Sequence, residues 1–288
     1  MPDPRVEDLE RAAARHWQAP DAERLGGWLL RAADGFTGRA NSALPLGDPG
    51  VPLPEAVTAV EDWYRRRDLR PMIVLPQGAG PDPLDQYLTE RGWVPRPGPA
   101  FVMTADIADV PASHAQVEFT PEPDAAFLRL YRYRGQALPP IARTLMMSAP
   151  WQAFGSIRRD GRAVAVGRVS VAGYPAAGYW GALTAVEVDP ARQRQGLGLA
   201  ITPALAAAAA DRGASRVLLQ VETDNAPARA LYSRCGFRDS HRYTTCSRPH
   251  DRAPSRPCYH ALIAPLSASR VPTRASCALS YYESSLRL

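Results

Sequence analysis

The chain is 288 residues long, 45% of its residues are hydrophobic, and its formal net charge is +5. It lacks an apolar run of membrane-spanning length and the start of a signal peptide, so we expect a cytoplasmic protein with no membrane partner. Residues 242–288 hold seven arginines against Asp251 and Glu283 and so account for the whole net charge, which argues against nucleic-acid binding by the folded body.

The first 112 residues predict an opening helix, a hairpin, and then a helix, a strand, a second helix and a second strand. In chain order, the residues concerned are 5–18, 27–46, 54–66, 72–75, 83–93 and 101–104. The pair Asp34-Gly35 is a strong turn signal between the strand-like runs of the hairpin. The length of the whole chain allows two domains, and a polar linker at residues 110–115 would end the first.

The second half opens with a predicted strand and two short helices, followed by a hairpin and a long strand. These elements are expected at residues 117–120, 127–131, 141–147, 153–171 and 179–188. The hairpin turns at Asp160-Gly161, and its run of small and β-branched residues indicates a strand that is covered on both faces. We therefore expect an α/β (α+β) protein.

The long strand leads into the first chemical motif, Gln193-x-x-Gly196-x-Gly198. Asp189-Pro190 ends the strand, and a helix is expected from Leu199, with Pro203 tolerated only in its first turn. Free N–H groups and the positive end of the helix dipole make such a turn an anion site. The chain contains no lysine, which excludes a Walker loop, and Ile201 disfavours a dinucleotide fingerprint. The plainer alternative is a turn whose glycines serve packing.

A second motif follows the next predicted strand, 217–222. It reads Asn225-Ala-Pro-Ala-Arg-Ala-Leu-Tyr-Ser-Arg-Cys-Gly-Phe237. The order of strand, Gln-x-x-Gly-x-Gly, helix, strand and Asn-x-x-Ala-x-x-Leu-Tyr-x-x-x-Gly-Phe resembles the GNAT superfamily of N-acetyltransferases. The resemblance spans about residues 115–245 and implies the GNAT acyl-CoA N-acyltransferase fold around a mixed central sheet.

A weak internal repeat extends the resemblance to the first half. Tyr87–Trp93 aligns with Leu231–Phe237 at an offset of 144 residues. Where the second half has its glycine loop, the first has Gly47–Pro52, whose prolines remove the N–H donors that a phosphate needs. We infer two tandem GNAT copies, similar in layout to mycothiol synthases. A degenerate copy is expected at 1–112, a catalytic copy at 116–247 and a disordered tail at 248–288.

The resemblance implies acetyl-CoA as the co-substrate. It places the pantetheine arm along the strand at Val186 and Val188, with Asn225 orienting it; the alternative role for Asn225 is a helix N-cap. The pyrophosphate would bind at the backbone of Gln193, Arg194, Gln195, Gly196, Leu197, Gly198 and Leu199. The scattered cysteines and histidines lack the spacing of metal ligands or of a disulfide framework, so no metal is expected.

The same resemblance makes Tyr232 the expected acid that protonates the departing thiolate; the alternative is a core tyrosine beneath Phe237. The base is less determined. Ribosomal-protein alanine acetyltransferases carry a glutamate where this chain has Gln220, and an amide cannot take a proton. Glu187 is the expected base, with Glu222 or a water chain behind it, and its alternative role is a salt-bridged carboxylate.

The sequence therefore predicts an N-acetyltransferase that moves an acetyl group from acetyl-CoA to a primary amine of a small molecule or a peptide N-terminus, by direct transfer in a ternary complex. The acceptor would bind between the two halves or under residues 137–147. A non-catalytic acyl-CoA sensor or scaffold is the alternative, and nucleic-acid binding through the tail is a third, weaker one. The pattern is compatible with a monomer or a homodimer.

Overall fold

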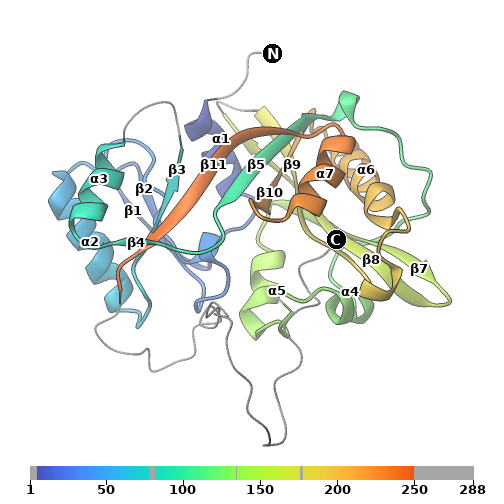
Figure 1. Ribbon diagram of the computed structural model, residues 1–288, viewed down its shortest axis with the longest axis horizontal. Coiled ribbons are helices and arrows are strands. Elements are labelled where there is room, and N and C mark those ends of the chain that lie inside the picture. The colour runs from blue at the N-terminus through green and yellow to red at the C-terminus, as the bar shows by residue number, and fades with distance from the viewer. Residues whose placement is uncertain (1–4, 78–81, 134, 176–177, 250–288) are drawn as a thin grey trace, which may run out of the picture.

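A computed structural model describes residues 5–77, 82–133, 135–175 and 178–249 (Figure 1). The expected disordered tail therefore lies, from residue 250 on, outside the described residues. The first half of the chain contains α1 (Val6–Ala14), β1 (Asp21–Leu25), β2 (Trp28–Ala32), the 3-10 turn η1 (Gly38–Ala40), α2 (Leu53–Arg65), β3 (Met72–Pro76), α3 (Pro83–Glu90), β4 (Val94–Pro95), β5 (Ala100–Asp106) and η2 (Ile107–Asp109).

The second half begins with a short edge strand and ends with a long one. It contains β6 (Glu118–Thr120), α4 (Ala125–Leu130), α5 (Pro140–Met146), β7 (Trp151–Arg159), β8 (Arg162–Tyr174), β9 (Gly178–Val188), η3 (Pro190–Arg192), α6 (Leu197–Ala210), β10 (Arg216–Glu222), α7 (Ala226–Arg234) and β11 (Arg238–Ser247). The predicted hairpin at 153–171 is β7–β8, and it turns where expected. The fold is mixed α/β, as the sequence predicts.

One mixed sheet of nine strands runs through the described part of the chain. Its order is β3-β11-β5-β10-β9-β8-β7-β6, with β4 paired to β11, while β1 and β2 form a separate hairpin. Only β9 and β10 pair in parallel among the long strands in this order. The parallel pair is the place where α6 crosses over, and the motif residues lie on that crossover.

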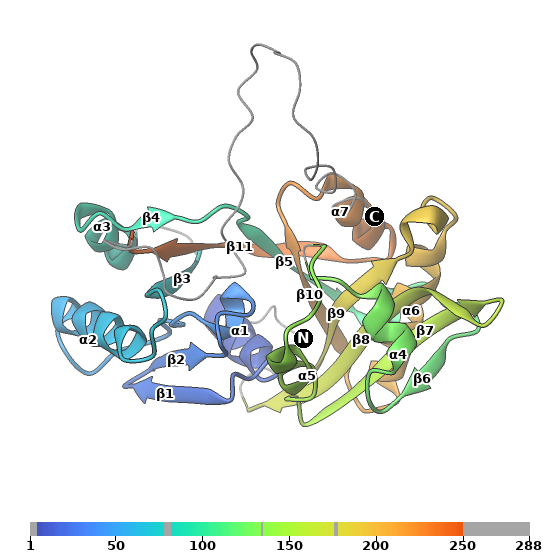
Figure 2. The ribbon, with the colours of Figure 1, turned by 90° about the horizontal axis from the view of Figure 1, so that it is seen from below.

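The two faces of this sheet are covered by different helices. Leu183, Val217 and Leu219 face α6 and α7, whereas Trp180 and Leu218 face α1. Because side chains alternate along a strand, each strand supplies both layers. In Figure 2 α1 lies between the two halves of the molecule, on the side of the sheet away from α7.

The repeat inferred from the sequence is present in the positions of the elements. α2 and α6 begin 144 residues apart, and so do β3 and β10. The final strands are exchanged between the copies: β5 of the first half lies between β10 and β11, and the end of β11 pairs with both β3 and β4. β11 runs from one half of the molecule to the other (Figure 1). The boundary at 112–116 stays a prediction, and the sheet is continuous across it.

Two local predictions were wrong. The N-terminal hairpin is β1–β2, turned at Gly26-Gly27, because the charged run Asp21–Leu25 is a strand. Asp34-Gly35 starts a longer loop closed by the Asn41 side chain, which accepts from Ala33 N and donates to Phe36 O. The loop still returns to β2, since Leu29 and Leu44 exchange backbone hydrogen bonds.

Pro203 lies in the interior of α6, not in its first turn. Since α6 already begins at Leu197, the proline removes the N–H that would bond to the Leu199 carbonyl. The neighbouring Ala200 carbonyl accepts from Ser113 Oγ at 2.7 Å. The linker between the two halves is thereby attached to this helix.

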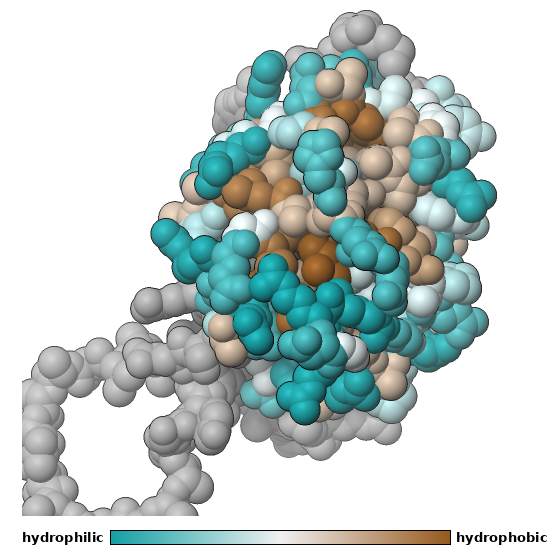
Figure 3. Space-filling view, turned by 90° about the vertical axis from the view of Figure 1, so that its right-hand side faces the viewer, coloured by the Kyte–Doolittle hydropathy of each residue, from teal (hydrophilic) through white to brown (hydrophobic). Residues whose placement is uncertain are grey.

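The edge of the sheet at β6 and the helix α4 carry exposed apolar side chains, Phe119 and Leu128. Figure 3, which views the right-hand side of Figure 1, shows apolar patches separated by hydrophilic side chains. β6 is only three residues long, which limits pairing with another edge. Among the helices that the structure describes, none is both long and apolar enough to cross a membrane.

Candidate active site

The centre of the sheet opens where β9 and β10 separate. The two strands pair only from Trp180 and Arg216 to Leu183 and Leu219, although both continue beyond this point. Ala185 has a φ of +53°, and the register between β8 and β9 shifts beside it. This is a β-bulge, which places an extra residue in β9.

The bulge reverses the faces of the residues that follow it. Val186 and Val188 both pack into the core under α6, so Glu187 between them lies on the opposite face. Simple alternation from Leu183, without a bulge, would have put Glu187 under α6. The bulge is therefore what presents the carboxylate to the side of the sheet that faces α1 and the first half.

Glu187 is half-buried, and burial raises the pKa of its carboxyl group from 4.5 to about 7. No salt bridge to Glu187 occurs within the part of the chain that the structure describes, so the expected alternative of an ion-paired sheet carboxylate is not what the geometry shows. A carboxyl group with a pKa near 7 can accept a proton at neutral pH.

The backbone of Val188 points into the opening. Asp189 N donates to Val164 O at 2.9 Å, so the pair formed by Val188 and Ala165 is the non-hydrogen-bonded kind. In an antiparallel ladder the two kinds alternate, and the N–H of Val188 is therefore directed away from β8, toward β10. Since β9 and β10 pair only as far as Leu183 and Leu219, this N–H has no acceptor on β10 within the described residues.

The Gln193–Leu199 motif forms the start of α6. Arg194 and Gly196 have positive φ values of 62° and 78°, and Gly196 is the N-cap. The N–H groups of Leu197, Gly198 and Leu199 precede the first intrahelical bond, which runs from Ala200 N to Gly196 O. These unpaired donors sit at the positive end of the helix dipole, as an anion site requires.

A groove of about 490 Å³ lies between this turn and α7. The residues that line it are Val188, Gln193, Arg194, Gly196, Leu197, Gly198, Leu199, Pro227, Ala230, Leu231 and Arg234. Most of the predicted cofactor residues therefore meet in one place, and Arg234 adds a cation that the sequence analysis missed. Gln195 lies outside the lining and accepts from Arg159, and Val186 contributes its side chain to the core.

α7 supplies the other predicted residues. Asn225 caps the helix, its Oδ1 accepting from Ala228 N at 3.1 Å. The Tyr232 ring packs on Phe237, with centroids 5.9 Å apart. Burial, followed by the charges of Cys235 and Glu187, raises the pKa of Tyr232. Its hydroxyl has no hydrogen-bond partner among the described residues. The ring is therefore a core residue, as the alternative reading expects, while the hydroxyl has no hydrogen-bond partner within the described residues and is available for chemistry.

Gly198 is fixed by packing. A Cβ on it would lie 2.4 Å from Leu231 Cδ1, so the glycine lets α6 and α7 approach closely. In contrast, a Cβ on Gly196 would meet nothing within 4 Å, and only the positive φ favours glycine there. The two glycines of the motif therefore act differently, one in helix packing and the other in the turn.

Small cavities lie on the other face of the opening, between the two halves. One, of about 190 Å³, is lined from the first half by residues 37–39 and 96–98 with Ala100, and from the second half by Tyr133, Gln220, Glu222, Tyr243 and Thr245. Gln220 and Glu222 share the α1 face with Leu218 by alternation. Tyr243 donates to Gln220 Oε1 at 3.4 Å. Glu187, Gln220 and Glu222 thus all lie on this face.

Arg168 is a second residue that the sequence analysis missed. It is fully buried beside the bulge and donates to Met146 O, Thr184 Oγ1 and His16 O. Burial lowers its pKa to about 9. The side chain links α5, β9 and the end of α1. In the sequence, the signal for this residue was an arginine inside the otherwise small and β-branched run 163–171.

Comparison with known proteins places this site in context. A family model described as "Probable histone acetyltransferase Rv0428c C-terminal" matches residues 4–246. The chain is 32% identical over 237 residues to the probable histone acetyltransferase Rv0428c of Mycobacterium tuberculosis, covering 82% of this chain and 72% of that protein. A stretch of 53 residues is 53% identical to the mycothiol acetyltransferase of Clavibacter michiganensis subsp. michiganensis and covers 18% of this chain and 17% of that one.

Two solved structures share the fold. One is a GCN5-related N-acetyltransferase from Kribbella flavida, with a TM-score of 0.62 and 18% identity, covering 86% of this chain and 97% of that chain. The other is a tandem GNAT protein from the clavulanic acid biosynthesis pathway, with a TM-score of 0.56 and 15% identity, covering 84% and 89%. At these identities the likeness concerns the fold alone.

Proposed function

The chain belongs to the family described as probable histone acetyltransferase Rv0428c, C-terminal, within the GNAT acetyltransferases, and from this premise we propose that it transfers an acetyl group from acetyl-CoA to a primary amine of a small molecule or a peptide N-terminus. The observation that carries the proposal is the bulged, separated end of β9. It places a carboxyl group of raised pKa on one face of the sheet and a helix N-terminal groove beside the other.

The donor side is the groove at α6. The pyrophosphate of acetyl-CoA would bind at the N–H groups of residues 197–199, with Arg194 and Arg234 as nearby cations. The pantetheine arm would extend along the unpaired edge of Val186–Val188 like an added strand. The acetyl carbonyl would then lie at the opening, where the Val188 N–H could donate to it.

The acceptor side is the face that carries Glu187. The cavity between the halves is small, and Arg39, Arg96 and Glu222 are its charged lining residues. A cavity of about 190 Å³ with charges of both signs is better matched to a small polar amine than to an extended, lysine-rich segment. We therefore place a small amine or a peptide N-terminus here in preference to a histone tail.

The chemistry follows from this placement. Glu187 takes a proton from the ammonium group, and the free amine attacks the thioester carbonyl carbon. The Val188 N–H donates to the oxygen that becomes negative in the tetrahedral intermediate. The C–S bond then breaks, and Tyr232 gives its proton to the leaving thiolate. The attacking nitrogen loses its second proton as the amide forms, and that proton returns Tyr232 to its neutral phenol form. The amide and free coenzyme A are the products, and the surplus proton on Glu187 returns to solvent.

Calorimetric titration with acetyl-CoA tests the donor site through two matched glycines. Gly196 and Gly213 both have left-handed φ values, of 78° and 84°, and a Cβ on either meets nothing within 4 Å. Gly196→Glu places an acid in the groove, whereas Gly213→Glu lies beyond the far end of α6. The wild type and Gly213→Glu should bind one equivalent at micromolar concentration, and Gly196→Glu should not bind. Equal loss in both variants, or no heat with the wild type, would contradict the proposal.

A further inference from the structure

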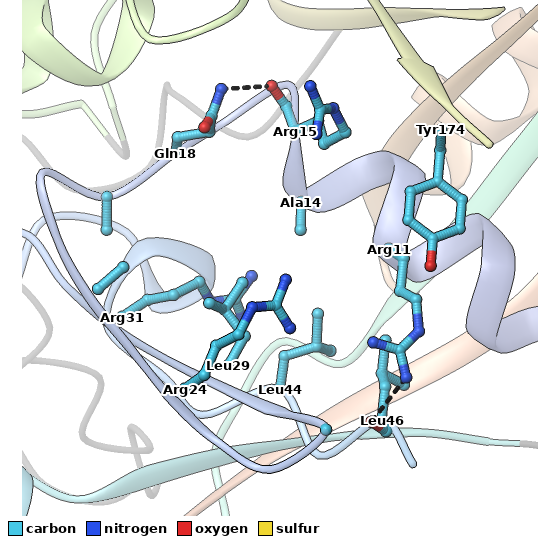
Figure 4. A pocket seen from close by; sticks show the side chains of 13 residues that line it. Arg11, Ala14, Arg15, Gln18, Arg24, Leu29, Arg31, Leu44, Leu46 and Tyr174 are labelled. Atoms are coloured by element: carbon cyan, nitrogen blue, oxygen red, sulfur yellow. Dashed lines mark hydrogen bonds between the residues drawn. The ribbon is translucent and has the colours of Figure 1, made fainter.

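A second cavity, of about 210 Å³, lies between α1 and the β1–β2 hairpin, away from the sheet opening (Figure 4). Thirteen residues line it, and four of them are arginines, Arg11, Arg15, Arg24 and Arg31. No aspartate or glutamate is among the thirteen. In Figure 4 the Arg24 head group rises from the hairpin toward α1, the Tyr174 hydroxyl is directed toward Arg11, and Leu29 and Leu44 form part of an apolar wall.

The local sequence explains why the charges gather here. Arg24 pairs with Leu29, and Ala22 pairs with Arg31, so both arginines lie on one face of the hairpin as diagonal neighbours. Asp21 and Glu23 alternate to the other face. There they are engaged by α2 and the residues that follow it: Asp21 bonds to Arg67, and Glu23 accepts from Trp63 Nε1 at 2.6 Å.

Helix α1 also directs arginines into the cavity. Arg11 and Arg15 are four residues apart and share one face of α1, with Ala14 and Gln18 beside them. α1 carries three acids and none of them lines this cavity; Glu7 borders a different one. Asp8 pairs with Arg5, and Glu10 pairs with the buried His241 at 2.7 Å. Helix α1 and the β1–β2 hairpin thus each direct arginines into the cavity and acidic side chains away from it.

The hydrogen bonds of these arginines go to neutral groups. Arg31 is 4% exposed and donates to the carbonyl and hydroxyl oxygens of Ser42. Arg11 donates to Leu46 O at 2.7 Å. Arg15 and Arg24 are exposed, and their guanidinium groups make no ion pair within the described residues. Four like charges around an apolar-walled cavity repel one another, and an anion in their midst would relieve that repulsion.

We propose that this cavity is a binding site for a small organic dianion, a phosphate monoester or a dicarboxylate. Guanidinium groups match the planar, bidentate geometry of both oxyanions. The site is separate from the acceptor cavity. Arg31 and Ala14 also border a space of about 20 Å³ that leads toward Gln220 and Tyr243. A cavity of that size holds about one water molecule, so the bound anion does not reach the catalytic opening.

The test titrates the full chain with glycerol 3-phosphate, with succinate and with inorganic phosphate, against chloride at matched ionic strength. Arg24→Gln and Arg15→Gln remove exposed cations from the cavity, and neither arginine side chain makes a hydrogen bond within the described residues. Arg66→Gln is the matched control, since Arg66 is also exposed in the first half and lines none of these cavities. Circular dichroism checks that each variant is folded.

We expect at least one of the organic anions to bind with a submillimolar Kd and a stoichiometry of one. Both cavity variants should weaken it tenfold or more, and Arg66→Gln should leave it unchanged. The stronger of the two anions identifies the head group. The proposal is overturned if no anion binds beyond chloride, or if only inorganic phosphate binds. It is also overturned if Arg66→Gln weakens binding as much as Arg24→Gln does. Binding that survives both cavity variants but is lost in Gly196→Glu would place the anion in the groove at α6 and likewise overturn it.

Discussion

Glu187 owes its position to the bulge in β9, which moves it from a packed face to a half-buried position on the other face of the sheet. We expect Glu187→Gln to lower kcat by about a hundred- to ten-thousand-fold, as for loss of a general base. In the wild type, kcat/KM should rise with pH through about 7, the pKa of the carboxyl group. The variant should lose that limb and keep only the rise that belongs to the amine acceptor. A wild-type profile with no limb near pH 7 would assign the base to a water chain or to Glu222.

The raised pKa of Glu187 also makes the stability of the folded protein depend on pH. Its folded pKa of about 7 lies above the usual 4.5, so the folded state binds this proton more tightly than the unfolded state does. Its contribution to stability is present below pH 4.5 and is lost as the pH rises through 7. The melting temperature of Glu187→Gln should therefore equal or exceed that of the wild type at pH 8, even though activity has fallen. A variant that melts lower at pH 8 would mean that the carboxylate is stabilising.

In Tyr232 the ring has the packing role, and the hydroxyl group has the proposed chemical role. Its ring is buried against Phe237, whereas its hydroxyl has no partner among the described residues. Tyr232→Phe keeps the ring, so we expect the free energy of unfolding to change by no more than about 0.5 kcal/mol, as for substitutions that disturb no contact. Turnover should fall by about a hundredfold or more. Unchanged turnover would leave Tyr232 as a core residue only.

At the scale of elements, the groove depends on how closely α6 and α7 approach. Gly198→Ala would push its Cβ into Leu231, and we expect a loss of about 1–3 kcal/mol from overpacking, together with weaker acetyl-CoA binding. Leu231→Ala should relieve the clash, so a double-mutant cycle measured by denaturant unfolding should give a coupling of about 0.5–3 kcal/mol. Additive effects would show that the two residues are not in contact.

Most elements could be predicted from local pattern, because their helices and strands carry clear period and turn signals. Asp160-Gly161 marked its hairpin correctly, whereas Asp34-Gly35 did not, because Asn41 closes a wider loop there. Local pattern cannot reveal contacts that depend on distant strands. The exchange of β5 into the second half, the bulge at Ala185 and the convergence of four arginines all arise from tertiary pairing. Gly196 and Asn225 could be found because they serve local backbone geometry, a left-handed turn and a helix N-cap.

At the scale of the molecule, we expect the exchanged strands to make the two halves one folding unit. β5 pairs with β10 along seven residues and with β11 on its other side. A second half without residues 1–112 would expose the facing edges of both strands, and unpaired edges favour aggregation. The buried pair of Glu10 with His241 and the bonds from Arg168 to His16 cross between the halves as well.

Cleavage of the linker tests this dependence on the native chain. A protease site inserted at residues 112–115 should be cut without separating the halves, because the hydrogen bonds of β5 persist after the cut. The nicked protein should elute as one species, melt in one transition and keep its acetyl-CoA binding. Residues 116–249 expressed alone should be insoluble, and co-expression with residues 1–112 should restore soluble protein. If residues 116–249 alone are soluble and bind acetyl-CoA, the second half folds independently and β5 is a dispensable addition to its sheet.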